Sequence, residues 1–241
     1  MSVQSREYWN DVSVEMKKAF WIERADDRKV ERFLKEETNL ERCFNDALWF
    51  ARDLGRGVQG KILDVGAGVA WSSAIISRLT AVTSVTALDY SQHRLFKIAP
   101  LVFEQLAGEK IKFEPIVGDF FEHSFKQACF DVVLFCQALY HFPDIDDTLR
   151  QVSDLLAPGG IVIITCERIT PEQGFYAWCK RGVRSWLQKR ADVTGNHFRV
   201  DSEYRHAIQH AGLEYRFQEL DYPVYPGKNP LSAGNHFGIK R

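Results

Sequence analysis

The sequence lacks several features that would assign a protein to a membrane, a secretory route or a nucleic acid. No apolar run approaches the length needed to span a bilayer, and the first ten residues, MSVQSREYWN, contain no apolar core of a signal peptide. The net charge of −1 gives no overall excess of the positive charge that nucleic-acid-binding proteins carry. We therefore expect a soluble, cytoplasmic protein with no transmembrane segment and no nucleic-acid partner.

Cysteine pairs suited to a disulfide framework or a zinc site are also missing. The five cysteines are odd in number and widely spaced, and no Cys-x-x-Cys pair occurs. His206 and His210 have the spacing of one helix face, but no nearby acid or third ligand accompanies them in the sequence. We predict reduced thiols and no metal site.

The length of 241 residues and the hydrophobic content of 45% suit one large α/β domain, and a second domain is not required. We divide this single domain into four parts. They are a helical N-terminal cap at residues 1–58, a core at 59–166, an insertion at 167–200, and a C-terminal helix with a pair of strands at 201–241.

Short apolar runs alternate with helical patterns from Lys61 onward. The predicted strands are residues 61–65, 82–89, 111–119, 130–136, 160–167, 213–221 and 235–240. The predicted helices between them are residues 72–79, 91–108, 144–160 and 201–212. Pro100 should kink or split the second of these helices. Buried strands joined by helices predict a doubly wound, mostly parallel seven-stranded sheet that binds ligands at the carboxyl ends of its strands.

The segment before this core is helical in pattern. Apolar residues recur every three or four positions between Leu40 and Ala51, with Asn39 as a plausible N-cap and Gly55 as a terminator. The preceding residues 23–37 are mostly charged, and we expect them to present a solvated face.

The run ILDVGAGVA at residues 62–70 predicts a buried strand that leads into a glycine turn, where the backbone can approach a nucleotide-like ligand. A dinucleotide fingerprint would need glycine at position 71, and Trp71 argues against it. A phosphate-binding loop at residues 55–61 is a chance match, because Ile62 replaces the hydroxyl residue and the segment precedes the strand.

A third pattern, acidic-x-Gly-x-Gly-x-Gly, is met by Asp64, Gly66 and Gly68, with Ala70 at its last position. The segments VTALDYS, VGDF, FDVVLFCQALYHFPD and LLAPGGIVIIT follow it in order. Across roughly residues 60 to 166 the sequence resembles the class I S-adenosylmethionine-dependent methyltransferases, in particular those that act on small molecules. The resemblance implies a Rossmann-like fold and S-adenosyl-L-methionine as cofactor.

The resemblance also implies which residues hold the cofactor. They are Asp64, Gly66, Gly68, Asp89, Tyr90, Asp119, Phe120 and Gln137. In this assignment Asp64 holds the turn, Asp89 accepts hydrogen bonds from the ribose hydroxyls, and Asp119 meets the adenine amino group. The alternatives are a turn-forming acid at position 89 and a helix N-cap at position 119.

The loop CQALYHFPD lies beside the transferred methyl group in this family, which makes Tyr140 and His141 candidate catalytic residues. His141 is a candidate general base, because an unperturbed imidazole pKa near 6.5 suits that role; the alternative is a histidine packed under the next helix. His197 is a second candidate, with a capping or surface histidine as its alternative. Tyr8 and Trp9 are either aromatics that close over the cofactor or ordinary core residues.

The fourth strand is not followed by the Asp/Asn-Pro-Pro-aromatic sequence of nucleobase amino methylases. We therefore expect O- or N-methylation of a small molecule or a biosynthetic intermediate by in-line displacement, without a metal. The basic, amphipathic residues 178–190 are a candidate lid for an anionic or carrier-bound substrate, with a membrane-surface helix or a solvated helix as alternatives. The rival functions are a non-catalytic adenosylmethionine-binding module and a nucleotide-dependent oxidoreductase.

Overall fold

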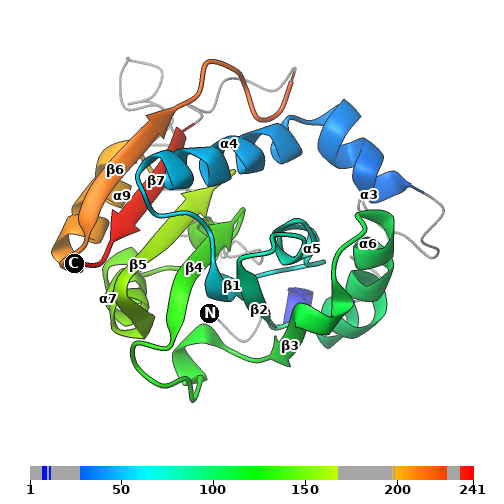
Figure 1. The fold of residues 1–241 in the computed structure, drawn as a ribbon, viewed down its shortest axis with the longest axis horizontal. Helices are drawn as coiled ribbons and strands as arrows, with labels where there is room; N and C mark the ends of the chain where they lie inside the picture. The colour runs from blue at the N-terminus through cyan, green and yellow to red at the C-terminus, as the bar shows by residue number, and fades with distance from the viewer. Residues whose placement is uncertain (1–6, 10, 12–27, 168–196, 198, 227–233) are drawn as a thin grey trace.

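The computed structural model describes residues 7–9, 11, 28–167, 197, 199–226 and 234–241. Seven strands form one sheet in the order β3-β2-β1-β4-β5-β7-β6 (Figure 1). Their bounds are β1 (Gly60–Val65), β2 (Val82–Asp89), β3 (Phe113–Val117), β4 (Phe130–Cys136), β5 (Leu156–Thr165), β6 (Glu214–Glu219) and β7 (Gly234–Ile239). The first five strands pair in parallel, and β7 is antiparallel to both β5 and β6. The predicted doubly wound, mostly parallel seven-stranded sheet is therefore confirmed.

The helices α3 (Lys29–Arg32) and α4 (Leu40–Asp53) precede β1. The helices α5 (Trp71–Ser77), α6 (Ala99–Gln105), α7 (Ile145–Leu155) and α9 (Asp201–His210) lie between strands. Residues 7–9 are also helical, and the structure has two π-helical turns (Phe33–Glu37 and Arg94–Ile98) and three 3-10 turns (Lys110–Lys112, Phe120–Glu122 and Leu139–His141) among the described residues. Pro100 lies at the start of α6, directly after the second π-helical turn, so the predicted long helix is split there.

Two apolar cores cover the two faces of the sheet. Alternate residues of β4 enter different cores, as Leu134 packs with the α4 and α5 side and Val133 with the α7 and α9 side. Figure 1 shows α7 and α9 next to each other on one part of the sheet, with α5 and α6 at the other. Because both faces are covered, the central strands carry continuous apolar runs and expose their carboxyl ends to a ligand.

The helix predicted before the core is present as α4, and Gly55 follows it with a φ of +71°. Asn39 occupies the N-cap position, but its side chain donates to the Pro223 carbonyl instead of capping the helix. The preceding charged segment is not only a solvated face, because Val30 and Leu34 are buried in the core. Their four-residue spacing places both on the inner side of one helical turn while the charges face outward.

Some sequence predictions fall outside the described residues. These include the basic segment 178–190 and most of the proposed insertion. In the part of the chain that the structure describes, no helix has the length and apolar character needed to cross a bilayer.

Candidate functional site

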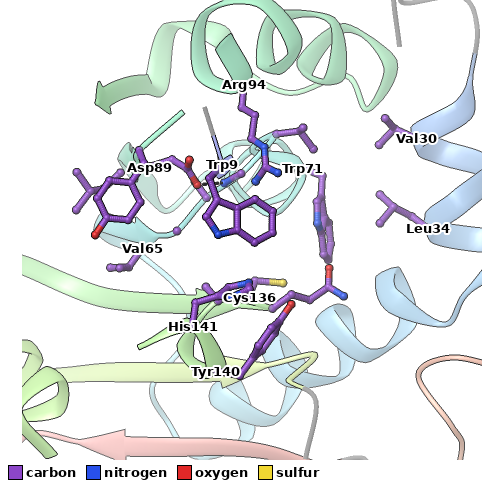
Figure 2. A pocket seen from close by; sticks show the side chains of 18 of the residues that line it. Trp9, Val30, Leu34, Val65, Trp71, Asp89, Arg94, Cys136, Tyr140 and His141 are labelled. Carbon is purple, nitrogen blue, oxygen red and sulfur yellow. Dashed lines mark hydrogen bonds between the residues drawn. The ribbon is translucent and has the colours of Figure 1, made fainter. Parts of the chain in front are cut away.

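A cavity of about 580 Å³ opens at the carboxyl ends of the parallel strands (Figure 2). Val65 of β1, Asp89 of β2 and Cys136 of β4 contribute to its wall. Other parts of the wall come from Trp9, from the segment 30–38, and from Tyr225 near the C-terminus. Segments that are far apart in the sequence therefore meet where this type of sheet binds ligands.

The glycine turn forms one side of the cavity. Gly66 and Gly68 both line it, with φ values of +66° and +57°. A Cβ atom on Gly66 would lie 2.9 Å from the Ala138 side chain, so position 66 has no room for any other residue. Ala70 also has a left-handed backbone, with a φ of +59°, which is uncommon for a residue with a side chain.

Asp64 lies beneath the turn and is absent from the described wall of the cavity. Its Oδ2 atom accepts hydrogen bonds from the hydroxyls of Ser72 and Ser73, each at 2.7 Å. Burial raises the pKa of this carboxyl group to about 6, and the two serine hydrogen bonds oppose that rise. The structure thus places Asp64 where it ties β1 to α5 and supports the turn, and not where it touches a ligand.

Asp89 lines the cavity, as predicted, and its carboxylate is held in one orientation. Its Oδ2 atom accepts the N–H of Gly68 at 2.8 Å, and Oδ1 accepts the N–H of Ser91 at 2.8 Å. Each oxygen keeps further lone pairs for donors inside the cavity. Tyr90, the next residue, also lines the wall.

Asp119 is a predicted cofactor-binding residue that is not among the described residues of the cavity wall. Gly118 and Phe120 line the cavity on either side of it, and Asp119 itself is buried. Its Oδ1 atom accepts the N–H of Phe121 at 2.9 Å and caps the short turn Phe120–Glu122. The capping alternative therefore accounts for this hydrogen bond, and contact with adenine stays a prediction.

The loop after β4 brings three predicted residues to the cavity: Gln137, Tyr140 and His141. Gln137 has a φ of +58°, and its amide nitrogen donates to the hydroxyl of Tyr225. The imidazole of His141 lies between two aromatic rings, with its centroid 5.0 Å from the ring of Trp9 and 4.2 Å from that of Tyr140. These contacts fix the direction of His141 toward the cavity.

His197 lies next to this loop through its backbone. Its N–H donates to the carbonyl of Tyr140 at 2.6 Å. His197 is not among the described residues that form the wall, so its assignment as a catalytic residue has no support from its position.

Glu167 holds the N–H groups of the same loop. Its carboxylate accepts hydrogen bonds from the backbones of Ala138, Leu139 and Tyr140 at 2.8 to 3.0 Å, and the hydroxyl of Tyr204 lies 3.3 Å away. Burial raises the pKa of Glu167 to about 7, while the three N–H donors favour its charged form. Glu167 follows β5 directly and therefore reaches the loop that follows the neighbouring β4.

Arg199 holds the carbonyl groups of this loop. Its buried guanidinium donates to the carbonyls of Leu139 at 3.5 Å, of Phe142, and of Pro143 at 3.0 Å. A further bond to the carbonyl of His197, at 3.1 Å, joins the segment before α9 to the loop. Glu167 and Arg199 thus provide hydrogen-bond partners for backbone N–H and carbonyl groups that have little access to water.

Arg94 places a cation in the wall of the cavity. Its guanidinium carbon lies 4.7 Å from the centre of the Trp9 ring, and Nη1 lies 3.7 Å from the place that a Cβ on Gly68 would occupy. Figure 2 shows the guanidinium directed toward Trp9. The positive charge of Arg94 therefore lies next to the glycine turn, where the backbone itself forms the wall of the cavity.

The other side of the cavity is apolar. It is formed by Val30, Phe33, Leu34 and Trp71. Figure 2 shows Trp9 between this group and Asp89. The ring of Trp71 is fixed by an edge contact with Phe44, with the ring centroids 5.2 Å apart. The cavity thus has a polar half at the strand ends and an apolar half formed by α3, the π-helical turn after it and the start of α5.

Three residues of this region were not predicted from the sequence: Arg94, Glu167 and Arg199. Glu167 carried a usable signal, because it ends a predicted strand in the same way as Asp89 and Asp119 end theirs. Arg94 follows Asp89 closely in the chain, which is weaker evidence that it belongs to the same site. Arg199 had no such signal, because its partners lie more than fifty residues away in the chain.

Comparisons with known proteins show which families the chain is similar to in sequence. Residues 63–164 match the family model described as a methyltransferase domain. The chain is 25% identical over 188 residues to sterol 24-C-methyltransferase ERG6A of Gibberella zeae, a match that covers 78% of this chain and 48% of that protein. It is 28% identical over 169 residues to the ubiquinone biosynthesis O-methyltransferase of Bordetella avium, covering 69% and 68% of the two chains. The chain therefore spans about half of the sterol methyltransferase and two thirds of the ubiquinone enzyme.

Among solved structures, the fold is similar to phosphoethanolamine N-methyltransferase 2 of Haemonchus contortus in complex with S-adenosyl-L-methionine. The TM-score is 0.69 at 14% identity, covering 99% of this chain and 60% of that chain. A methyltransferase of Leishmania major gives a TM-score of 0.63 at 14% identity, covering 98% and 82% of the two chains. At such low identity these likenesses establish a shared fold.

Proposed function

Since residues 63–164 form a class I S-adenosylmethionine-dependent methyltransferase domain, we propose that this chain methylates an oxygen or nitrogen atom of a small molecule with an apolar body. One observation carries the proposal: a single cavity joins the glycine turn and Asp89 to an apolar wall that contains Leu34 and Trp71. When bound, S-adenosylmethionine supplies a methyl group on a positively charged sulfur atom. The chain has to place an acceptor atom in line with that methyl group and exclude water.

The polar half of the cavity fits the cofactor. The bare backbone at Gly66 and Gly68 allows the methionine portion to approach closely, because no side chain intervenes. The oriented carboxylate of Asp89 is able to accept hydrogen bonds from both ribose hydroxyls. Leu88 and Phe120 offer apolar surface for the adenine ring.

Arg94 has a specific role in this arrangement. A guanidinium repels a positively charged sulfur, so Arg94 is suited to the one negatively charged group of the cofactor, the carboxylate of its methionine portion. Its position over Gly68 agrees with this role, because the glycine turn is where the methionine portion would lie. The contact with Trp9 orients the guanidinium.

The apolar half of the cavity would hold the methyl acceptor. Burial of an apolar body against Val30, Leu34 and Trp71 is favoured by about 25 cal/mol for each Å² removed from water. The names of two relatives, a sterol methyltransferase and a ubiquinone biosynthesis methyltransferase, are in line with acceptors that are largely hydrocarbon. Residues 178–190, which lie outside the described residues, would still add positive charge for an anionic or carrier-bound acceptor.

His141 is our candidate for the proton transfer. A hydroxyl acceptor loses its proton as an oxygen lone pair forms the new bond to carbon, whereas an ammonium acceptor must lose a proton first, because only the neutral amine has a lone pair. A neutral imidazole is able to take the proton in either case. His141 lies in the wall between Trp9 and Tyr140, so its ring is already oriented. The mechanism needs no metal ligand from the chain.

The test is a turnover assay with S-adenosylmethionine and a panel of hydroxyl and amine compounds, matched in size but differing in the apolar area of the body. We expect S-adenosylhomocysteine and a product that is heavier by one methyl group, with apolar compounds preferred. The variant Asp89→Asn should weaken cofactor binding, whereas His141→Gln should bind the cofactor normally and turn over about a hundredfold more slowly.

Two outcomes would contradict the proposal. Tight cofactor binding by calorimetry without turnover of any compound would favour a non-catalytic adenosylmethionine-binding module. Turnover that is confined to polar compounds would leave methyl transfer intact but exclude the apolar acceptor.

A further inference from the structure

Three potential metal ligands meet outside the cavity, on the packed helices α7 and α9. One ligand atom each from Asp146, His206 and His210 lies within 4.8 Å of the other two. The sequence predicted no third ligand for the histidine pair, because Asp146 is sixty residues away in the chain. Figure 1 shows the two helices side by side, which is how the fold supplies the missing acid.

The spacing between Asp146 and His210 is that of two ligands on one metal ion. Asp146 Oδ1 and His210 Nδ1 are 3.4 Å apart, longer than the roughly 2.7 to 2.9 Å of a charge-assisted hydrogen bond. Two ligands held about 2.0 to 2.2 Å from a tetrahedral zinc ion are themselves separated by about 3.4 Å. The carboxylate oxygen is closed to solvent and has no hydrogen-bond partner among the described residues, so a cation between the two atoms would satisfy it.

His206 completes the set from one turn earlier on α9. Its ring centroid lies 5.7 Å from that of His210, with 23° between the ring planes. Residues four apart project from the same face of a helix, and both histidines are exposed, so a change of rotamer brings the His206 nitrogen within bonding distance.

We propose that Asp146, His206 and His210 form a binding site for a divalent transition metal. Two imidazoles and one carboxylate suit Zn²⁺, Ni²⁺ or Cu²⁺, with water at the open positions, whereas Mg²⁺ and Ca²⁺ prefer oxygen ligands alone. None of the three residues lines the cavity, so the site is separate from methyl transfer. Its effect is to join α7 to α9, the two helices that cover one face of the sheet.

The experiment is a calorimetric titration of the untagged, EDTA-treated full chain with Zn²⁺, with Mg²⁺ as the negative control. We expect one equivalent of Zn²⁺ to bind at this site and to raise the melting temperature. Each of the variants Asp146→Asn, His206→Gln and His210→Gln should bind Zn²⁺ at least about tenfold more weakly. Co²⁺ should give the absorption bands of a tetrahedral ion in the wild type and lose them in the variants.

Gln209→Ala is the matched control, because Gln209 is an exposed residue of α9 beside His210. This variant should bind Zn²⁺ as the wild type does. The proposal is overturned if the wild type binds no Zn²⁺, or if the triple variant keeps the wild-type affinity, since the metal would then be held elsewhere. Neither result depends on whether the chain methylates anything, because the readouts are binding and spectra.

Discussion

Glu167 and Arg199 hold one short loop by its opposite polar groups, the carboxylate through backbone N–H groups and the guanidinium through backbone carbonyls. Both side chains are buried, and neither lies in the wall of the cavity. The loop between them carries Tyr140 and His141 into that wall. The direction of the candidate catalytic residues is therefore set by two residues that do not touch the ligand, which makes Glu167 and Arg199 positioning residues.

The variant Glu167→Gln should disturb the loop after β4, although the glutamine side chain is about as large as the glutamate side chain. An amide has one acceptor oxygen, so at least one of the three buried N–H groups loses its partner, at a cost of about 1 to 3 kcal/mol. At pH 4.5, where the contribution of Glu167 is complete, we expect the free energy of unfolding to fall by this amount. We also expect kcat for methyl transfer to fall more than cofactor affinity does. Urea denaturation and steady-state kinetics measure the two effects. Glu219→Gln, at an exposed site on β6, is the control, and equal behaviour of the two variants would contradict the positioning role.

The raised pKa of Glu167 predicts a pH dependence of stability. Burial moves this pKa from 4.5 to about 7, so between these pH values the folded chain binds more protons than the unfolded chain. The stability contributed by the neutral carboxyl is complete below pH 4.5 and is lost as the pH rises to about 7, a change of about 3 kcal/mol.

Asp64 also has a raised pKa, of about 6, and therefore adds its own pH dependence to the stability. Because Asp64 is present in both the wild type and Glu167→Gln, the difference between their unfolding free energies isolates the contribution of Glu167. The difference in unfolding free energy between the wild type and Glu167→Gln should shrink as the pH rises from 4.5 to 7. Urea titrations at several pH values measure it. A difference that grows with pH would mean that the three N–H donors outweigh burial.

The proposed role of Arg94 predicts a loss of cofactor affinity in the variant Arg94→Met. Removal of a charge-assisted contact worth about 1.5 to 3 kcal/mol should raise the Kd of S-adenosylhomocysteine by about tenfold to a hundredfold. Methylthioadenosine, which lacks the amino acid carboxylate, should bind both proteins alike. Calorimetry with the two ligands separates lost charge pairing from general damage to the cavity. Lys97→Met, at an exposed position on the same helical segment, should change neither affinity.

Ala70→Gly should stabilise the protein. Ala70 has φ +59° and ψ 32°, a conformation that costs a residue with a side chain about 1 to 2 kcal/mol and costs glycine little. After allowance for the greater freedom of glycine in the unfolded chain, we expect a gain of about 0.5 to 1 kcal/mol in thermal or urea unfolding. Ala51→Gly, inside α4, should have the opposite sign. A loss of stability at position 70 would indicate that the methyl group makes contacts worth more than the strain.

The parts of the fold that follow from local patterns were predictable. The spacing of apolar residues gave α4, and the buried runs joined by helices gave the parallel sheet. Asp89 was placed in the cavity because an acid at the end of a parallel strand faces the ligand edge. Trp71 was recognised as incompatible with a dinucleotide turn, but its place in the apolar wall depends on α3 and α4, which the local pattern does not specify.

The remaining features depend on contacts between distant segments. Val30 and Leu34 are flanked by charged residues, so the sequence pattern predicted a solvated face, although both side chains are buried in the core. Asp119 satisfies a neighbouring N–H, which a pattern of strand ends does not distinguish from a residue that faces the cavity. The bonds of Arg199 and the meeting of Asp146 with His210 require the packing of α7 against α9 and the course of the chain before α9.

The placement of β7 between β5 and β6 has a consequence for the order in which the sheet is completed. On a ribosome, β6 is synthesised before β7, yet the strand that pairs with it is β7, so β6 has no strand partner in the sheet until β7 has been made. Until β7 is in place, the backbone N–H and carbonyl groups along the adjoining edge of β5 have no partner from β7. Such an edge can pair with strands of other chains. Asn235 marks the closing step, because its buried side chain accepts from Thr165 on β5 at 2.7 Å and donates to Gln218 on β6 at 2.9 Å. The strands whose ends line the cavity, β1, β2 and β4, are therefore synthesised before β7 covers the edge of β5.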